Sequence, residues 1–239
     1  MSPKTAPPEF RNWILAGLSA GDRRLLLPDL EAIQLGLRQS LEAANQPITH
    51  VYFPSDGLAS IVARDPSDRQ GEVGVVGCEG MTGMPVLLGN SQSPHESYMQ
   101  IAGTGHRLSV SALRTALAKS ATLRTLMSRY VHALTIQMSH TALANAKVKV
   151  NARLARWLLM ADDRVSGDVI KLTHEFLALM LGVRRQGVTD ALQELEGKRL
   201  IRASRGKISI LDRPGLESAA DGCYGAPEAE YRRLMAEPT

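Results

Sequence analysis

Cysteine is scarce in this chain of 239 residues, and its scarcity narrows the chemistry that the protein can perform. The two cysteines, Cys78 and Cys223, lie far apart in the sequence, so we expect two ordinary thiols rather than a disulfide. An iron–sulfur cluster usually takes four thiolates from its protein, and two cysteines do not supply them. We therefore expect neither a disulfide nor a cluster.

Long apolar runs are also missing. No stretch reaches the length of about 18 apolar residues that marks a membrane-spanning helix, so we expect none. The first ten residues, MSPKTAPPEF, lack the basic start and apolar block of a secretory signal, which indicates a cytoplasmic protein.

The common motifs of enzymes are absent from the sequence. We find no phosphate-binding loop, no helix with two zinc-binding histidines and no cluster of cysteine and histidine at metal-binding spacing. We therefore expect that the chain is not an enzyme. Hydrophobic residues make up 44% of it, enough for a substantial core without metals or disulfides.

Positive charge is concentrated in one part of the chain. The net charge is +2 over residues 1–148, +5 over residues 149–215 and −3 over residues 216–239. A basic segment of this kind is typical of a nucleic-acid-binding domain. Charge alone also fits a solvated surface, so the motifs must decide between the two.

The sequence predicts an α+β fold in four parts. Short apolar runs separated by turn formers fill residues 31–110, as in Asp65-Pro66-Ser67-Asp68, and predict an antiparallel β-roll. We place this sensor-like roll at 9–120, a long helix at 121–148, a DNA-binding domain at 149–215 and a tail helix at 216–239. We expect Tyr231 and Leu234 of the tail to pack on the DNA-binding domain.

The long helix contains neither glycine nor proline, and at about 1.5 Å per residue it is roughly 42 Å long. Its apolar stripe suits pairing of two copies, which predicts a homodimer. A helix packed internally on the roll is the alternative. The predicted dimer interface consists of Leu123, Met127, Tyr130, Leu134 and Thr141.

Residues 172–212 contain the most specific pattern in the sequence. Thr173 is a good N-cap for a helix that ends before Gly182, and a second helix runs from about Arg184 to about Lys198. Two short strands follow, joined by a turn at 204–206. Helix, turn, helix and hairpin in this order predict a winged helix-turn-helix.

Side chains suited to DNA gather at the start of the second helix and on the hairpin. Arginine pairs with guanine and glutamine with adenine, while the hairpin cations suit the phosphate backbone. The predicted DNA-binding residues are Thr173, Arg184, Arg185, Gln186, Thr189, Arg205 and Lys207.

Several of these segments together resemble the Crp/Fnr family of bacterial transcription regulators. The strongest parts are RLARWLL at 153–159, LTHEFLA at 172–178 and LGVRRQGVT at 181–189, with VYFP at 51–54 and GCEGMTG at 77–83 in the roll. The resemblance implies a cyclic-nucleotide-binding-like roll, a dimer helix, a two-fold DNA operator and possible contact with RNA polymerase.

The nucleotide site departs from the family's cyclic-AMP pattern. The positions of the ribose and phosphate contacts read Gly83-Met84 and His95-Glu96, and the adenine position reads Met138-Ser139. Methionine offers no acceptor for a ribose hydroxyl, and a carboxylate repels a phosphate. We therefore expect no ordinary binding of cyclic AMP.

Other effectors stay open as alternatives. A different nucleotide or a small molecule could occupy the roll, and haem has candidate ligands, although a lone histidine is more often structural. The candidate haem ligands are His50, His95, His106, His132 and His140. A ligand-binding module that contacts a protein partner instead of DNA is the alternative of another class.

Overall fold

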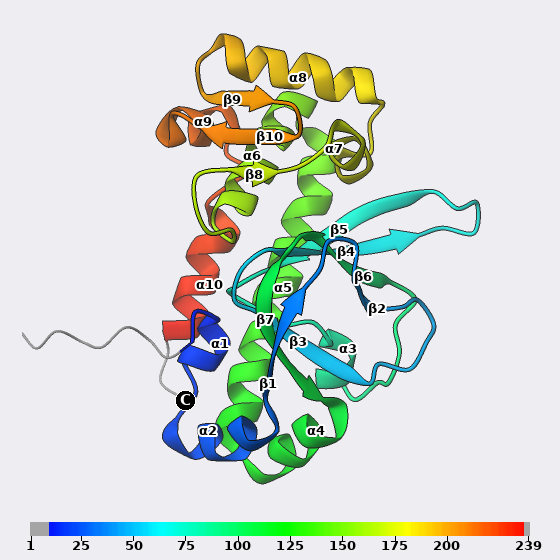
Figure 1. Cartoon of the computed structure of the whole chain (residues 1–239), viewed down its shortest axis with the longest axis vertical. Coiled ribbons are helices and arrows are strands. Elements are labelled where there is room, and N and C mark those ends of the chain that lie inside the picture. Colours follow the sequence, from blue (N-terminus) through cyan, green and yellow to red (C-terminus); the bar gives the residue numbers. More distant parts are fainter. Residues whose placement is uncertain (1–9, 237–239) are drawn as a thin grey trace, which may run out of the picture.

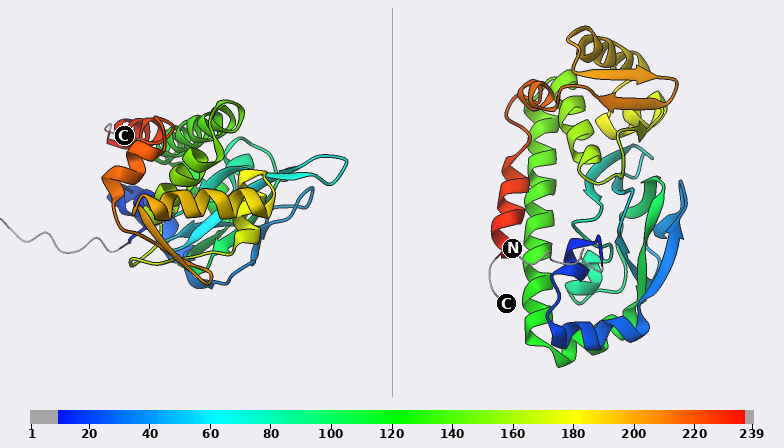
Figure 2. Two further views of the ribbon diagram at one scale, coloured as in Figure 1. Left: turned by 90° about the horizontal axis from the view of Figure 1, so that it is seen from above. Right: turned by 60° about the vertical axis from the view of Figure 1, so that its left-hand side comes forward.

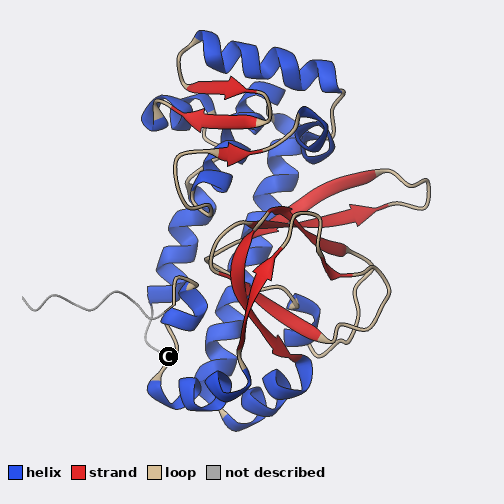
Figure 3. Ribbon diagram, viewed as in Figure 1, coloured by secondary structure: helices blue, strands red, loops and turns tan. Residues whose placement is uncertain are grey.

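The structure is a computed structural model, and it describes residues 10–236. Its frame is one long helix, with a β-roll packed along its first part and a smaller domain at its far end (Figure 1). Both strands and helices are abundant, and they are separated along the chain as the predicted α+β fold requires (Figure 3). Every helix within residues 10–236 is too short or too polar to serve as a membrane span.

The roll consists of two antiparallel sheets with the strand orders β1-β7-β3 and β2-β6-β4-β5. Two short α-helices precede it, each begun by a side chain that caps the first turn, and a 3-10 turn, η1, follows them. The elements are α1 (Trp13–Ala16), α2 (Ala20–Leu26), η1 (Leu27–Asp29), β1 (Glu31–Leu35), β2 (Ser40–Glu42), β3 (His50–Pro54), β4 (Leu58–Arg64), β5 (Gln70–Val76), β6 (Glu96–Ile101) and β7 (Gly103–Ser109).

One apolar run of the roll, at 84–88, is a helical turn and not the strand that its sequence indicates. Gly83 adopts a left-handed conformation with φ of 86°, and Pro85 stands in the first turn of α3 (Met84–Leu87). Proline is favoured in a first turn because the missing N–H would have no partner there. These two residues start a helix where hydrophobicity alone suggests a strand.

After the connecting helix α4 (Val110–Lys119), the long helix α5 (Ala121–Lys147) runs beside the roll and on to the second domain (Figure 2). The side chain of Ser120 caps its first turn by accepting a bond from the Leu123 N–H. Tyr130 is 2% exposed, and its hydroxyl donates to the Met81 carbonyl at 2.6 Å. The roll is therefore bonded to the middle of α5.

The predicted dimer interface on α5 needs correction. Leu123, Met127, Tyr130 and Leu134 belong to the core of the roll, with no more than 4% of any of them exposed. Thr141 is 9% exposed and accepts a bond from the buried Arg156 side chain. The apolar stripe thus packs on the same protomer, as in the alternative of an internally packed helix. A dimer interface along this stripe would require the roll to separate from α5.

The second domain begins with α6 (Val150–Asp162) and is a winged helix-turn-helix. It comprises β8 (Ile170–Lys171), α7 (His174–Leu181), α8 (Arg185–Gly197), β9 (Ile201–Ser204) and β10 (Lys207–Ile210), with the strand order β8-β10-β9. The sequence did not reveal β8, because two residues are too few to show alternation. The apolar core is continuous with the roll through Leu58, Val75 and Ile101.

The C-terminal segment contains α9 (Arg213–Ala219) and α10 (Ala226–Ala236). Contrary to the prediction, α10 lies along α5 and not on the winged domain (Figure 2). Leu234 is buried as expected, and the Tyr231 hydroxyl donates to the Glu79 carbonyl of the roll. Two faces of α5 are therefore covered within the protomer, one by the roll and one by α10.

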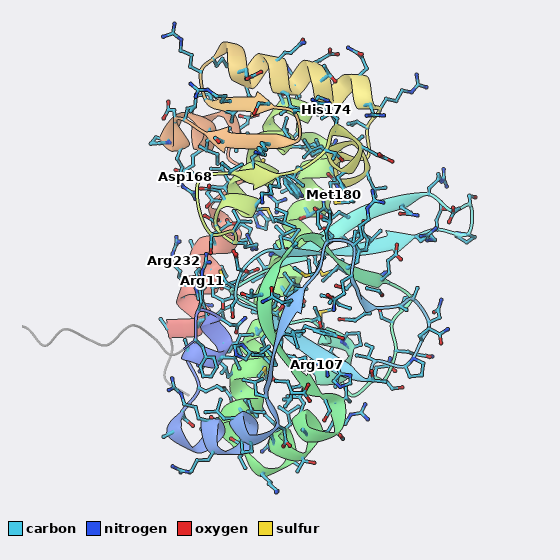
Figure 4. All side chains as sticks on the ribbon, in the orientation of Figure 1. Arg11, Arg107, Asp168, His174, Met180 and Arg232 are labelled. Carbon is cyan, nitrogen blue, oxygen red and sulfur yellow. The ribbon has the colours of Figure 1, made fainter. Side chains whose placement is uncertain are left out.

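A buried carboxylate joins the roll to the second domain. Glu72 of β5 accepts bonds from the Trp157 indole of α6 at 2.8 Å and from the Ser60 hydroxyl at 2.5 Å. Met180 of α7 lies at the same junction (Figure 4), with its sulfur 3.7 Å from that hydroxyl. Burial raises the pKa of Glu72 to about 7, although the two hydrogen bonds and the charges of Arg156 and Arg164 oppose the rise.

This raised pKa predicts a fall in stability with rising pH. Between the ordinary pKa of 4.5 and about 7, the folded protein binds a proton that the unfolded chain has lost, so stability falls through this window and then levels off. Glu72→Gln keeps the shape without a charge: its Oε1 atom still accepts from the Trp157 indole, and its amide nitrogen can donate to the Ser60 hydroxyl oxygen instead of accepting from it. Thermal unfolding should show the variant equal to the wild type near pH 5 and more stable near pH 8. An unchanged pH dependence in the variant would contradict the assignment.

Candidate nucleic-acid interface

The helix-turn-helix is built by local signals in the chain. The Thr173 hydroxyl accepts a bond from the Phe176 N–H and starts α7. Gly182 ends α7 in a left-handed conformation with φ of 60°, which glycine adopts without strain. Arg184 is the N-cap of α8, and Val188 and Leu192 bury one face of α8 against α6 and α7. The first turn of α8 consequently faces outward.

Three of the predicted DNA-binding side chains stand exposed at this first turn, namely Arg184, Arg185 and Gln186. The helix N-terminus adds its own positive potential there, which attracts a phosphate. The Gln186 amide already donates to Asp190 at 2.7 Å, so this side chain is held in one orientation. The arrangement places two cations and one oriented amide where a recognition helix meets base edges.

Thr173 and Thr189 have roles within the protein. The Thr173 hydroxyl is engaged as the cap of α7. The Thr189 hydroxyl lies 3.3 Å from the Nδ1 atom of His174 and donates to the Arg185 carbonyl. His174 (Figure 4) was not among the predicted residues, and it links α7 to α8 beside the exposed first turn of α8.

The wing adds a second basic surface. Arg205 and Lys207 are exposed at the turn between β9 and β10, as predicted. Lys171 of β8 pairs with Lys207 in the sheet register and is also exposed. Like charges opposite one another on a sheet are unfavourable alone and are relieved by an anion between them. Sequence reasoning missed Lys171 because it did not find β8.

The predicted effector residues come together only in part. A cavity of ≈ 30 Å³ between the roll and α5 is lined by Gly83, Met84, His95, Glu96 and Met138. Ser139 does not line it, because successive helical residues point about 100° apart, and its hydroxyl bonds back to the Thr135 carbonyl on the exposed face of α5. The cavity has room for about two water molecules.

Glu42 is a member of this cavity that sequence reasoning missed. Its carboxylate accepts a bond from the Gly83 N–H at 2.6 Å, and burial raises its pKa. An internal carboxylate therefore occupies a backbone donor that an anionic ligand would otherwise use. Glu42 and Glu96 bring two acidic groups to the cavity, which disfavours a phosphate.

The geometry defines a class of protein, in which a winged helix-turn-helix follows a roll and a long helix. Residues 152–219 match the family model of the Crp-like helix-turn-helix domain. Comparison with curated protein sequences gives no match.

Solved structures of transcription regulators share the fold. A regulator of the CRP family from Thermus thermophilus has 18% identity and a TM-score of 0.66, covering 81% of this chain and 99% of its own. Another, of the CRP/FNR family from the same organism, has 21% identity, a TM-score of 0.60 and coverage of 80% and 99%. The c-di-GMP responsive global regulator CLP of Xanthomonas campestris has 17% identity, a TM-score of 0.64 and coverage of 80% and 99%.

Residues 152–219 therefore form a Crp-like helix-turn-helix domain, and most of the chain shares the fold of solved structures of Crp/Fnr regulators. The family model confirms the predicted helix-turn-helix domain, and the shared fold confirms the predicted α+β architecture.

The roll cavity predicts that cyclic AMP does not bind tightly. A nucleotide exceeds the ≈ 30 Å³ available, and its phosphate would meet Glu42 and Glu96. Isothermal titration calorimetry should detect no binding of cyclic AMP at micromolar concentrations. Low-micromolar binding that also strengthens DNA association would refute this account of the cavity.

Proposed function

We propose that the protein regulates transcription in the cytoplasm as a homodimer that binds a two-fold DNA operator, with RNA polymerase as a further partner. The observation that carries this proposal is the exposed first turn of α8, where Arg185 and Gln186 stand beside an open helix N-terminus. Arginine pairs bidentately with guanine, and glutamine with adenine.

The proposed dimer uses the face of α5 that neither the roll nor α10 covers. Exposed residues recur on it in steps of four and three, which is the spacing of a coiled-coil seam. Their side chains are mostly small and would allow two helices to approach closely. They are Ser128, His132, Thr135, Ser139, Ala142 and Ala146. Leu143, at the edge of this stripe, is 56% exposed and gains from burial against a partner.

The two basic surfaces suit different parts of the DNA. The first turn of α8 would read base edges, whereas Lys171, Lys207 and Arg205 on the wing would bind phosphates. Glutamine at 186, where the family resemblance implies glutamate in cyclic-AMP-dependent members, favours adenine over cytosine. We therefore propose an operator that differs from theirs. A module that contacts only a protein partner does not account for this pairing of surfaces.

We further propose that the protein binds DNA without cyclic AMP or haem in the roll. Both ligands are far larger than the cavity, and Glu42 already occupies the Gly83 N–H. A small effector of another class remains the alternative. It would have to displace Glu42 or enter elsewhere.

Two adjacent variants on α5 separate the dimer face from the protomer core. Thr135→Glu places like charges at the proposed seam and should shift the protein toward monomer with little loss of thermal stability. Leu134→Glu buries a charge in the roll core and should cost several kcal/mol of folding stability instead. Analytical ultracentrifugation and thermal unfolding measure the two effects.

Thr115→Glu is the matched control for the seam variant. Thr115 is exposed on α4, and its hydroxyl bonds back one turn to the Ser111 carbonyl, as that of Thr135 does to the Val131 carbonyl. The control should remain dimeric. A wild type that is monomeric with and without DNA, or a Thr135→Glu variant that dimerises normally, would rule out the proposed seam.

A second pair of variants tests how DNA is read. Arg185→Ala should lose about 1–3 kcal/mol of discrimination at one base position in each half-site while keeping non-specific binding. Lys207→Ala should weaken operator and random DNA alike and lower the salt slope by about one per contact. Fluorescence anisotropy on both duplexes across a salt series distinguishes these outcomes. An unchanged operator preference in Arg185→Ala would show that the proposed register of α8 is wrong.

A further inference from the structure

A larger cavity lies on the side of α5 that α10 covers. Its volume is ≈ 220 Å³, against ≈ 30 Å³ for the cavity in the roll. The roll, α5, the winged domain and α10 all contribute to its walls. Its lining includes Trp13, Glu79, Ala133, Arg164, Arg213 and Tyr231.

A buried carboxylate with one unused oxygen lines this cavity. Glu79 is 8% exposed, and its Oε1 atom accepts bonds from Arg164 at 2.9 Å (Nε) and 2.8 Å (Nη2). The Oε2 atom is buried and has no hydrogen-bond partner among residues 10–236. An unsatisfied carboxylate oxygen is costly, so a ligand that donates a hydrogen bond to it is favoured.

The walls beside this carboxylate are aromatic. The rings of Trp13 and Tyr231 lie 5.6 Å apart at 58° to each other, and Trp13 is 49% exposed. The hydroxyls of Tyr130 and Tyr231 already donate to backbone carbonyls, which fixes both rings. Aromatic faces held in this way attract planar groups, and they attract cations most.

Two of the three arginines that line the cavity are paired with acidic groups. Arg164 is paired with Glu79, while Arg213 bonds Asp162 at 2.5 Å and Asp163 at 2.6 Å. Arg232 on α10 (Figure 4) also lines the cavity, but it is exposed, so solvent screens its charge. The unpartnered oxygen of Glu79 therefore favours a hydrogen-bond donor over an anion at this site.

We propose that this cavity is a binding site for a small planar cation with N–H donors, such as an aromatic amidine or amine. The cationic end donates to Glu79 Oε2, and the ring packs against Trp13 and Tyr231. The site is separate from the roll cavity. Because a ligand there touches the roll, α5 and the winged domain together, it contacts all the parts whose relative placement positions α8.

Three probes of one shape and different charge test the proposal on the full chain. Benzamidinium is a cation with N–H donors, benzamide is neutral and benzoate is an anion. Calorimetry should show benzamidinium binding at least about tenfold more tightly than benzamide, which is 1.4 kcal/mol or more, and no measurable binding of benzoate. Equal binding of the three, or no binding of benzamidinium, overturns the proposal. No DNA is present, so the result is independent of the proposed operator binding.

Variants then locate the bound probe. Ala133→Leu fills the cavity from α5 and should abolish binding of benzamidinium, whereas Ala229→Leu on the exposed face of α10 should not change it. Glu79→Gln should weaken benzamidinium at least about tenfold and reduce its advantage over benzamide. Trp13→Ala should also weaken binding, and because Trp13 is half-exposed, this variant serves if a buried variant fails to fold. If benzamidinium binds unchanged to Trp13→Ala, and also to whichever of Ala133→Leu and Glu79→Gln folds, the probe lies elsewhere.

Discussion

The packing of α5 constrains every other feature of this protein. One face of the helix carries Tyr130 and Leu134 into the core of the roll, and a second face is covered by α10. A single long face is left free. Because the helix continues into the domain that carries α8, whatever pairs along that free face also sets the separation of two recognition helices. The helix therefore links the folding of the protomer to the proposed pairing and DNA reading.

The same packing explains the closed roll. Met138 and Leu134 approach the cavity from α5, and Glu42 fills the position beside the Gly83 N–H from the opposite side. In a roll of this kind, space for a ligand depends on side chains that enter from both walls. Here side chains from both walls leave a cavity of ≈ 30 Å³, whereas a cavity of ≈ 220 Å³ lies on the other side of α5, under α10. If a small molecule acts on this regulator, the structure favours that second side.

Local signals in the sequence were reliable guides to the DNA-binding end. A capping threonine at 173 and a left-handed glycine at 182 each act over a few residues, so the helix-turn-helix and the exposed Arg185 and Gln186 could be predicted. Sequence patterns did not show which distant segment packs against a predicted apolar face. An apolar stripe shows that Leu134 is buried but does not say against what, so the roll was mistaken for a second copy.

Three further features could be recognised only from the three-dimensional structure. Glu42 lies 41 residues from Gly83 and meets it only because β2 returns beside the loop before α3. Lys171 becomes part of the wing only through pairing with β10. The tail helix shows amphipathic residues such as Leu234, yet its partner, α5, cannot be read from its own sequence. In each case the decisive contact joins segments far apart along the chain.

The central claim is that this protein, without added ligand, reads a two-fold DNA site through the first turn of α8. The most direct test is selection of bound duplexes from a random DNA pool by the purified full chain. We expect enrichment of an inverted repeat, with half-sites about one helical turn of DNA apart. Enrichment of no motif, or of a single unpaired half-site, would contradict it.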